Sequence, residues 1–393
     1  DSQPCLVGSE MCIRDRHYES KYHQLKTIRT MAKYKFLYLD DENDETTAAI
    51  ADGLQIDGLI EVKYEQPKTF GEEIKDLKAR LKDFDGLILD LRLDGKALDI
   101  AYNAPSIAQE LRMIAAEGGV KPCPIILCST DERMRATYDV EKICHEHFDY
   151  KFTKQVSPPW KKFAIKLSSL AKGYQFIFDS NFNLVPILGR EDLSALDSRV
   201  LEHFTDLEKP LPVYDYASFV IKELFHQPGV LIKERLLAAR LGIDIEKSED
   251  WQKLSGDFFS KALFSGVFSD GWRRWWMDIV QNIFKEASKG KRLTMLNASE
   301  RVKILSEISG LKNLAAATPM EYNKSLNFWA ICEFFKCPID PLEGFKIHTT
   351  IEPKAWQDER YVSLKAVLEK RYPRPHSSES NRIKLIKEEL SSR

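Results

Sequence analysis

The chain has few cysteines, no long apolar run and no marked excess of charge of either sign. Seven cysteines occur among 393 residues, which suits a reducing, cytoplasmic setting. No apolar stretch approaches the roughly 20 residues that a helix needs to cross a bilayer, so we expect no membrane association. Lys and Arg number 58 against 60 Asp and Glu, whereas domains that bind nucleic acid are usually more basic.

Motifs of several enzyme classes are also missing. The sequence contains no GxSxG, Walker A loop, HExxH or CxxC, so no motif nominates a catalytic site of those kinds. Cys332 and Cys337 frame the segment CEFFKC. No second pair of cysteines or histidines stands at ligand spacing, so we expect no zinc site.

We interpret residues 1–30 as a non-native leader. The first 16 residues, DSQPCLVGSEMCIRDR, resemble a translated sequencing adapter and lack the apolar region of a secretory signal. Met31 is the expected start, because the first predicted strand follows it at once.

Four short segments carry the strongest signal in the chain. They are FLYLDDEND (36–44), LILDLRLDG (87–95), PIILCST (124–130) and FDYKFTK (148–154). A short apolar run bounded by turn residues is typical of a buried parallel strand. The carboxyl ends of parallel strands meet at one edge of the sheet, where the functional crevice forms. The polar residues expected at that edge are Asp40, Asp41, Asp90, Ser129, Thr130 and Lys154.

This set of side chains suits phosphoryl chemistry. Three neighbouring carboxylates repel one another unless a cation lies among them, and oxygen ligands with room for water suit Mg²⁺. A lysine and a hydroxyl opposite the metal would bind a phosphoryl group from other sides. A carboxylate can itself accept that group as an acyl phosphate.

The ordered segments resemble the receiver domain of two-component response regulators, over roughly residues 33–172. The resemblance implies an α/β, flavodoxin-like, doubly wound sheet of five parallel strands. It implies that Asp90 is the phosphoacceptor, Ser129 the switch hydroxyl and Lys154 the partner of the phosphoryl group. The Mg²⁺ ligands that it implies are Asp40, Asp41, Asp90 and the backbone carbonyl of Arg92.

The resemblance also implies a partner and a limit on activity. The phosphoryl donor would be a histidine kinase or a related ATPase. The protein would not be an enzyme beyond its own phosphorylation and dephosphorylation. Gln155 stands where the family usually has proline, and Lys151 stands where it usually has an aromatic residue. One alternative is therefore a receiver-like adaptor that is not phosphorylated, in a multi-gene defence or stress system.

The remainder of the chain is predicted to be mostly α-helical. We divide it into a receiver-like domain (31–172), a linker that could hold a hairpin (173–212) and a helical output or interaction domain (213–393), with Gly173 as the expected hinge. YQFIFDSNFNLVPIL (174–188) has strand propensity around an Asp-Ser-Asn turn. The predicted helical segments, with apolar residues at three- and four-residue steps, are 216–229, 231–243, 254–268, 272–290, 299–311, 327–337 and 361–372.

The segment LIKERLLAARLGI (231–243) raises the alternative of a DNA-binding regulator, since it could open a helix-turn-helix. A recognition helix should then follow with basic and polar residues. The sequence that follows, DIEKSEDWQKLSGDFF, is acidic at its start. DNA binding is therefore not favoured, and the simpler interpretation is an amphipathic helix capped at Gly242.

The most unusual local feature of the helical half is the segment WRRWW. It consists of Trp272, Arg273, Arg274, Trp275 and Trp276, and on a helix Trp272 and Trp276 would share a face. Tryptophan and arginine are enriched at protein interfaces. The alternatives are a tryptophan-rich core seam, a partner-docking surface made by Trp272, Arg273, Trp275 and Trp276, and stacking on nucleic-acid bases.

Overall fold

A five-stranded parallel sheet organises the N-terminal part of the chain. The structure is a computed structural model that describes residues 34–42, 44–93, 102–130, 134, 146–155, 158–205, 207–349 and 351–391. The predicted leader lies outside the described residues. The strands are β1 (Tyr34–Leu39), β2 (Ile60–Glu65), β3 (Gly86–Asp90), β4 (Ile125–Thr130) and β5 (Tyr150–Lys154).

The strand order is β2-β1-β3-β4-β5, and every neighbouring pair is parallel. This is the flavodoxin-like order, so the predicted fold class is confirmed. All five residues of β3 are buried, which explains why that strand reads as a continuous apolar run. The order reverses between β1 and β3, and the crevice of such sheets lies at the carboxyl ends of those strands.

Helices cover both faces of the sheet. On one face α3 (Phe70–Arg80) and α4 (Ala104–Ala116) pack on a core that includes Leu37, Leu89 and Leu127. On the other face α2 (Asp44–Leu54) and α6 (Trp160–Asp179) pack on a core that includes Phe36 and Ile88. Successive strand residues point to opposite faces of the sheet, so a strand can contribute side chains to the core on either face.

A buried ion pair ties these layers together at the amino ends of β4 and β5. Asp149 accepts hydrogen bonds from Arg112 Nη2 (2.7 Å), from the Tyr174 hydroxyl (2.7 Å) and from the backbone N–H of Ile125 (2.8 Å). The guanidinium of Arg112 also lies 3.9 Å from the ring centroid of Tyr214, in the helical half. Each oxygen of this buried carboxylate therefore has a partner, as burial of a charge requires.

The predicted hairpin after residue 172 does not form. Helix α6 runs without a break to Asp179, and α7 (Leu184–Leu188) follows. Tyr174 and Ile177 continue the buried stripe of α6, so packing outweighs the strand propensity of this segment. Gly173 lies within the unbroken helix α6 and not in a loop between two domains. A Cβ there would come within 2.2 Å of the Phe268 ring, so close packing explains the glycine.

The rest of the chain is helix-rich, as predicted. Its α- and π-helices are α8 (Val213–Ser218), the π-helix η7 (Phe219–His226), α9 (Glu234–Leu241), α10 (Trp251–Lys253), the π-helix η8 (Leu254–Phe258), α11 (Met277–Ala287), α12 (Ala298–Ser309), α13 (Leu364–Leu368) and α14 (Ser380–Ser391). None of the helices in the described part of the chain has the length and apolar character needed to cross a membrane.

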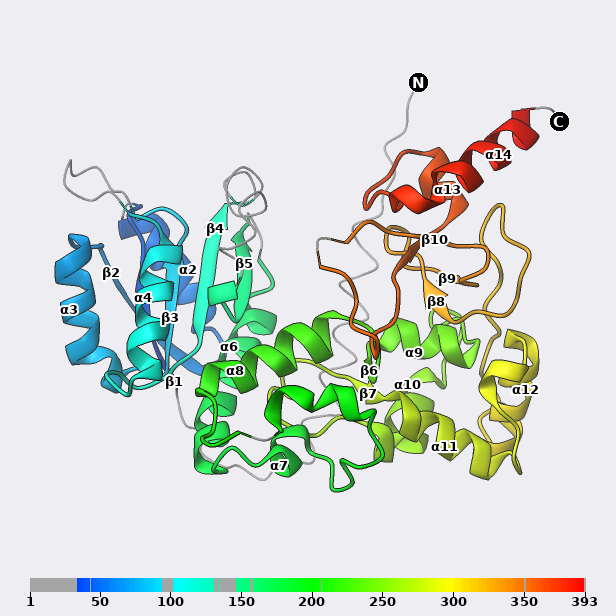
Figure 1. Cartoon of the computed structure of the whole chain (residues 1–393), viewed down its shortest axis with the longest axis horizontal. Coiled ribbons are helices and arrows are strands. Elements are labelled where there is room, and N and C mark those ends of the chain that lie inside the picture. The colour runs from blue at the N-terminus through cyan, green and yellow to red at the C-terminus, as the bar shows by residue number, and fades with distance from the viewer. Residues whose placement is uncertain are drawn as a thin grey trace.

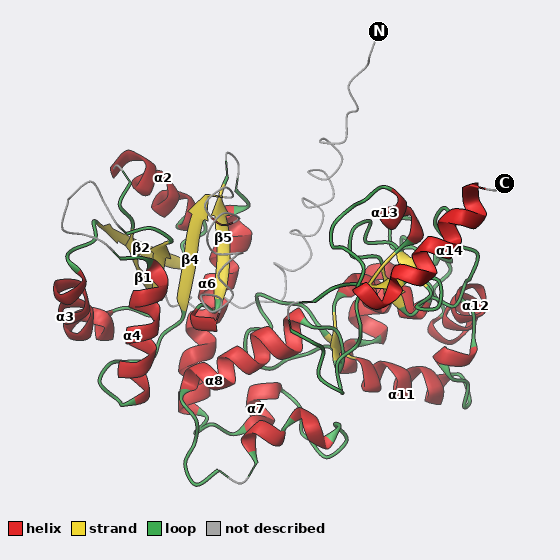
Figure 2. Cartoon of the chain, turned by 45° about the horizontal axis from the view of Figure 1, so that its top comes forward, coloured by secondary structure: helices red, strands yellow, loops and turns green. Residues whose placement is uncertain are grey.

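Three antiparallel strand pairs interrupt these helices. They are β6–β7 (Leu231–Ile232 with Trp275–Trp276), β8–β9 (Ala330–Ile331 with Pro338–Ile339) and β10–β11 (Phe345–Lys346 with Tyr361–Val362). Figure 2 shows these short strands among the helices, apart from the large sheet. The helices predicted for 327–337 and for the start of 272–290 are therefore wrong, because short apolar runs do not distinguish strand from helix.

The sheet and the helical half share one core. In Figure 1 the sheet lies on the left, α9 to α14 lie on the right, and α6, α7 and α8 lie between them. The apolar cluster under α2 and α6 continues without interruption through α7, α8 and η7 to Phe268, Trp272 and Trp276. The core between the sheet and α6 thus continues into the helical half.

Candidate functional site

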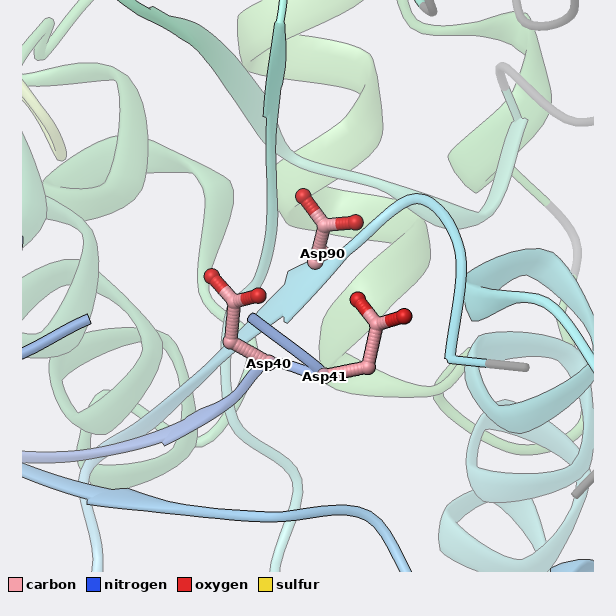
Figure 3. A group of neighbouring side chains, drawn as sticks. All are labelled: Asp40, Asp41 and Asp90. Atoms are coloured by element: carbon pink, nitrogen blue, oxygen red, sulfur yellow. The ribbon is translucent and has the colours of Figure 1, made fainter. Parts of the chain in front are cut away.

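Three carboxylates meet at the carboxyl ends of β1 and β3. Asp40 and Asp41 follow the last residue of β1, and Asp90 is the last residue of β3. One oxygen of each carboxylate lies within 4.8 Å of the other two. Figure 3 shows the three side chains grouped together. Among the described residues this is the one group of His, Cys, Asp and Glu close enough to hold a metal. The strand order explains the meeting, since β1 and β3 are neighbours.

Lys154 joins two of these carboxylates. Its ammonium lies 2.8 Å from Asp40 Oδ2, 3.0 Å from Asp90 Oδ1 and 3.3 Å from Glu42 Oε1, and its side chain is buried. Burial alone would lower the pKa of Lys154, but Asp90 and Asp40 outweigh it and hold the pKa above its ordinary value. Lys154 is therefore a fixed cation at the floor of the site.

Asp90 is fully buried, and its environment opposes ionisation. Burial raises the pKa of Asp90 to about 6, a shift that Lys154 counters and that the charge of Asp40 reinforces. The backbone N–H of Arg92 donates a hydrogen bond to Asp90 Oδ2 at 3.1 Å. The carboxylate form thus dominates at neutral pH, and its negative charge lies at the carboxyl end of β3.

Tyr38 and Cys128 complete the surroundings of Asp40, and the sequence analysis missed both. The buried hydroxyl of Tyr38 donates a hydrogen bond to Asp40 Oδ2 and lies 3.7 Å from Cys128 Sγ. The backbone N–H of Glu42 donates to Asp40 Oδ1 at 3.0 Å. The signal was present in the sequence, because residues two apart on a strand share a face and Tyr38 precedes Asp40 by two.

The remaining predicted residues lie beside this group. Ser129 is fully buried near the end of β4, and its hydroxyl makes no hydrogen bond within the described part of the chain. Thr130 pairs in register with Lys154 across β4 and β5. The backbone of Arg92 reaches the site through its N–H, while the role of its carbonyl as a metal ligand stays a prediction.

The donor set fits a magnesium ion. Carboxylate oxygens are hard ligands, and three of them within 4.8 Å of one another can surround one small cation and leave positions for water. The charges of Asp40, Asp41 and Asp90 exceed the single charge of Lys154, so the group retains room for a dication. Glu42, at the rim, adds to the negative charge.

The tryptophan segment does not form a surface. Trp272, Trp275 and Trp276 are buried, and Trp275 and Trp276 form strand β7 and not a helix. The core-seam interpretation is therefore confirmed, and the alternative of a docking surface made by these residues together with Arg273 is wrong. Burial of three indoles outweighs their suitability for an interface, since each removes a large apolar area from water.

The helix of segment 231–243 behaves as the simpler interpretation predicted. Helix α9 ends at Gly242, whose φ of 75° forms a left-handed cap. Six of its eight residues are buried, and Arg240 is held by Asp358 at 2.6 Å. This helix is part of the core of the helical half.

Comparisons with solved structures give receiver domains. A response regulator receiver domain protein from Clostridium thermocellum is 17% identical, with a TM-score of 0.28, and the match covers 37% of this chain and 98% of that one. The phosphorylated cyanobacterial phytochrome response regulator RcpA is 18% identical, with a TM-score of 0.22, over 38% of this chain and 96% of that one. No family model and no curated protein matches the sequence. These likenesses concern the fold, which the strand order establishes by itself.

Proposed function

We propose that the protein is a signalling protein whose receiver-like sheet accepts a phosphoryl group on Asp90. The observation that carries the proposal is the meeting of Asp40, Asp41 and Asp90 at one strand edge with Lys154 between two of them. The donor would be the phosphohistidine of a partner kinase, a related ATPase, or a small acyl phosphate or phosphoramidate.

Asp90 is the nucleophile of the proposed step. One oxygen of its carboxylate bonds to phosphorus while the bond from phosphorus to the donor atom breaks, and the leaving group keeps that electron pair. The product is an acyl phosphate, and water later returns it to carboxylate and inorganic phosphate. Because the pKa of Asp90 is about 6, the nucleophilic carboxylate is the main form at pH 7 and above.

Other residues of the chain bind and orient the transferred group. Asp40 and Asp41, with the carbonyl of Arg92, would hold Mg²⁺, which when bound offsets charge on the phosphoryl oxygens. On phosphorylation the carboxylate of Asp90 no longer carries the negative charge that pairs with Lys154. The ammonium of Lys154 then pairs with the phosphoryl oxygens. The hydroxyl of Ser129 donates to a phosphoryl oxygen on the β4 side.

The helical half reads the state of the sheet and passes it to a protein partner. Support comes from the shared core, in which α6 contacts the sheet on one side and residues such as Phe268 and Trp272 on the other. A change at the sheet that shifts α6 must be accommodated by the helical half, because close-packed cores transmit displacement.

Intact-protein mass spectrometry after incubation with acetyl phosphate or phosphoramidate and Mg²⁺ tests the proposal. We expect one added phosphoryl group on the full chain, and none on Asp90→Asn. Asp83→Asn is the matched control, since Asp83 is an exposed aspartate outside the site, and it should be labelled like the wild type. Uptake by Asp90→Asn at the wild-type level would disprove the assignment. Absence of uptake by the folded wild type would favour the adaptor that is not phosphorylated.

A further inference from the structure

A group of basic side chains, close enough to act on one another's charge, lies where α6 meets the helical half. Its members are Lys166 on α6, His226 at the end of η7, Lys233 before α9 and Arg274 before β7. They come from distant parts of the sequence, and the sequence pattern gave no sign that they would meet. None of them belongs to the acidic site at the strand ends.

The ladder of β6 and β7 sets two of these cations against each other. Leu231 pairs with Trp276 and Ile232 with Trp275 in antiparallel register. By that register Lys233 comes opposite Arg274. Like charges directly opposite on neighbouring strands destabilise a sheet, so this pairing opposes folding unless an anion offsets it.

Arg274 is nine-tenths buried, and no carboxylate of the described residues binds it. Its Nη1 donates to the carbonyl of Arg273 at 2.8 Å and its Nη2 to the carbonyl of Phe225 at 3.2 Å. Its buried Nε has no hydrogen-bond partner in the described part of the chain. Burial of a guanidinium without a counter-charge is costly. An anion bound beside Arg274 would offset that cost.

Lys166 and His226 lie beside these two opposed cations. Lys166 Nζ lies 5.0 Å from the ring centroid of Trp272 and donates to the hydroxyl of Tyr150 at 3.3 Å. Desolvation by the surrounding protein and the neighbouring cations lower the pKa of Lys166 to about 8 and that of His226 to about 4, although part of His226 reaches solvent. His226 is therefore neutral near pH 7, while Lys166 is mostly charged. Each of these groups therefore gains from an anion that would favour its charged form.

Glu333 is the carboxylate that acts on Lys233, and it is already engaged. Burial and Arg274 lower the pKa of Lys233 to about 8, while Glu333 opposes that shift. Glu333 is bound by Lys336 Nζ and Arg360 Nε, each at 2.8 Å. Its negative charge is thus shared with two further cations, and the area keeps a positive excess.

We propose that Lys166, His226, Lys233 and Arg274 bind the phosphoryl group of a small phosphorylated molecule. Helix α9 starts directly after Lys233, so its dipole adds to the positive potential. Its first residue, Glu234, offsets part of that potential, and its carboxylate accepts a hydrogen bond from Trp251 Nε1 at 2.9 Å. A small ligand fits better than a polymer, because Arg274 is buried while only parts of His226 and Lys233 reach solvent. The bound oxyanion joins α6 to the start of α9, and so fixes the helical half against the last helix of the sheet domain.

Thermal unfolding of the full chain tests the site, with orthophosphate, pyrophosphate or ADP against potassium chloride at equal ionic strength. We expect at least one phosphate compound to raise the wild-type melting temperature above the chloride control. Lys233→Met should raise the melting temperature in chloride, because it removes the repulsion with Arg274, and should weaken the phosphate effect about tenfold in apparent affinity. Lys303→Met, which removes an exposed lysine of α12, should respond to phosphate like the wild type.

His226→Gln provides a second variant in case Lys233→Met does not fold, and its phosphate affinity should also fall. Orthophosphate or pyrophosphate acting as strongly as ADP would identify an inorganic ligand or a terminal phosphate, and ADP acting alone would identify a nucleotide. Equal responses of the wild type, Lys233→Met and His226→Gln, or no response beyond that to chloride, would overturn the proposal. These outcomes do not depend on phosphorylation of Asp90.

Discussion

Two regions of the molecule treat buried charge in opposite ways. One is the acidic end of the sheet, formed by Asp40, Asp41 and Asp90. The other is the cationic junction, formed by Lys166, His226, Lys233 and Arg274. At the acidic end, Lys154 lies within 3.0 Å of both Asp40 and Asp90, so part of the negative charge is neutralised inside the protein. At the junction, Arg274 is buried with two backbone carbonyls and no carboxylate among the described residues. The first group has an internal counter-ion, and the second does not.

The two regions differ in whether they need a bound ion to offset their charge. A site that keeps an internal counter-ion can stay folded without a ligand, and it uses a ligand to rearrange existing pairs. A group without a counter-ion is a constant electrostatic cost until an ion arrives. The acidic end is therefore suited to a reversible change of state, and the junction to the retention of a bound anion.

Removal of Lys154 should give the largest effect, because it takes the counter-ion from the acidic end. We expect Lys154→Met to lower the free energy of unfolding by about 3 kcal/mol at neutral pH without Mg²⁺, since Asp40 and Asp90 then lose their shared partner. Urea unfolding measures this. Added Mg²⁺ should recover part of the loss. Lys151→Met, at an exposed position of the same strand, should change the free energy by less than about 0.5 kcal/mol, and a loss as large as that of Lys154→Met would break the comparison.

Tyr174→Phe should give a smaller effect at Asp149, a buried charge with its own partners. The change removes the hydroxyl that donates to Asp149 Oδ1 at 2.7 Å and keeps Arg112 in place. We expect a loss of about 2 kcal/mol in denaturant unfolding, the usual worth of a hydrogen bond to a charged group. Tyr372→Phe, at an exposed tyrosine, should cost close to nothing. A loss from Tyr174→Phe as small as that from Tyr372→Phe would show that Asp149 does not need the hydroxyl.

His226 should give the smallest effect, seen as a pH dependence at the junction. The pKa of His226 is lowered to about 4 by desolvation and by the charges of Lys233, Arg274, Lys166 and Lys222. In the unfolded chain the pKa keeps its ordinary value near 6.5. The unfolded state thus holds more protons between these values, so stability should rise with pH from about 4 to 6.5 and be lost as pH falls.

Thermal unfolding across that pH range, in chloride, measures the slope, and His226→Gln should reduce it. The exposed His203→Gln is the control and should leave the slope as it is. If His226→Gln kept the wild-type slope, the cations of the junction would not act on His226 in solution.

The acidic end could be predicted from the sequence, and the junction could not. Asp40, Asp90 and Lys154 each follow an apolar run, so a rule about strand ends places them on one edge. Lys233 and Arg274 meet through a ladder of two residues per strand, which is too short to leave a pattern. The apolar spacing of WRRWW suits a helix and a strand alike. The pairing of β7 with β6 decides in favour of a strand.

The length of α6 has a consequence for how this protein is related to modular regulators. A domain that can be exchanged between proteins carries its own sealed surface, and its borders fall in exposed linkers. Here the helix that closes the sheet passes Gly173 without a break, and the ring of Phe268 packs against it where a side chain would otherwise stand. Recombination at that border would expose the apolar face on both fragments. The sheet and the helical half are therefore expected to be inherited as a pair, with substitutions at Gly173 and Phe268 compensating one another.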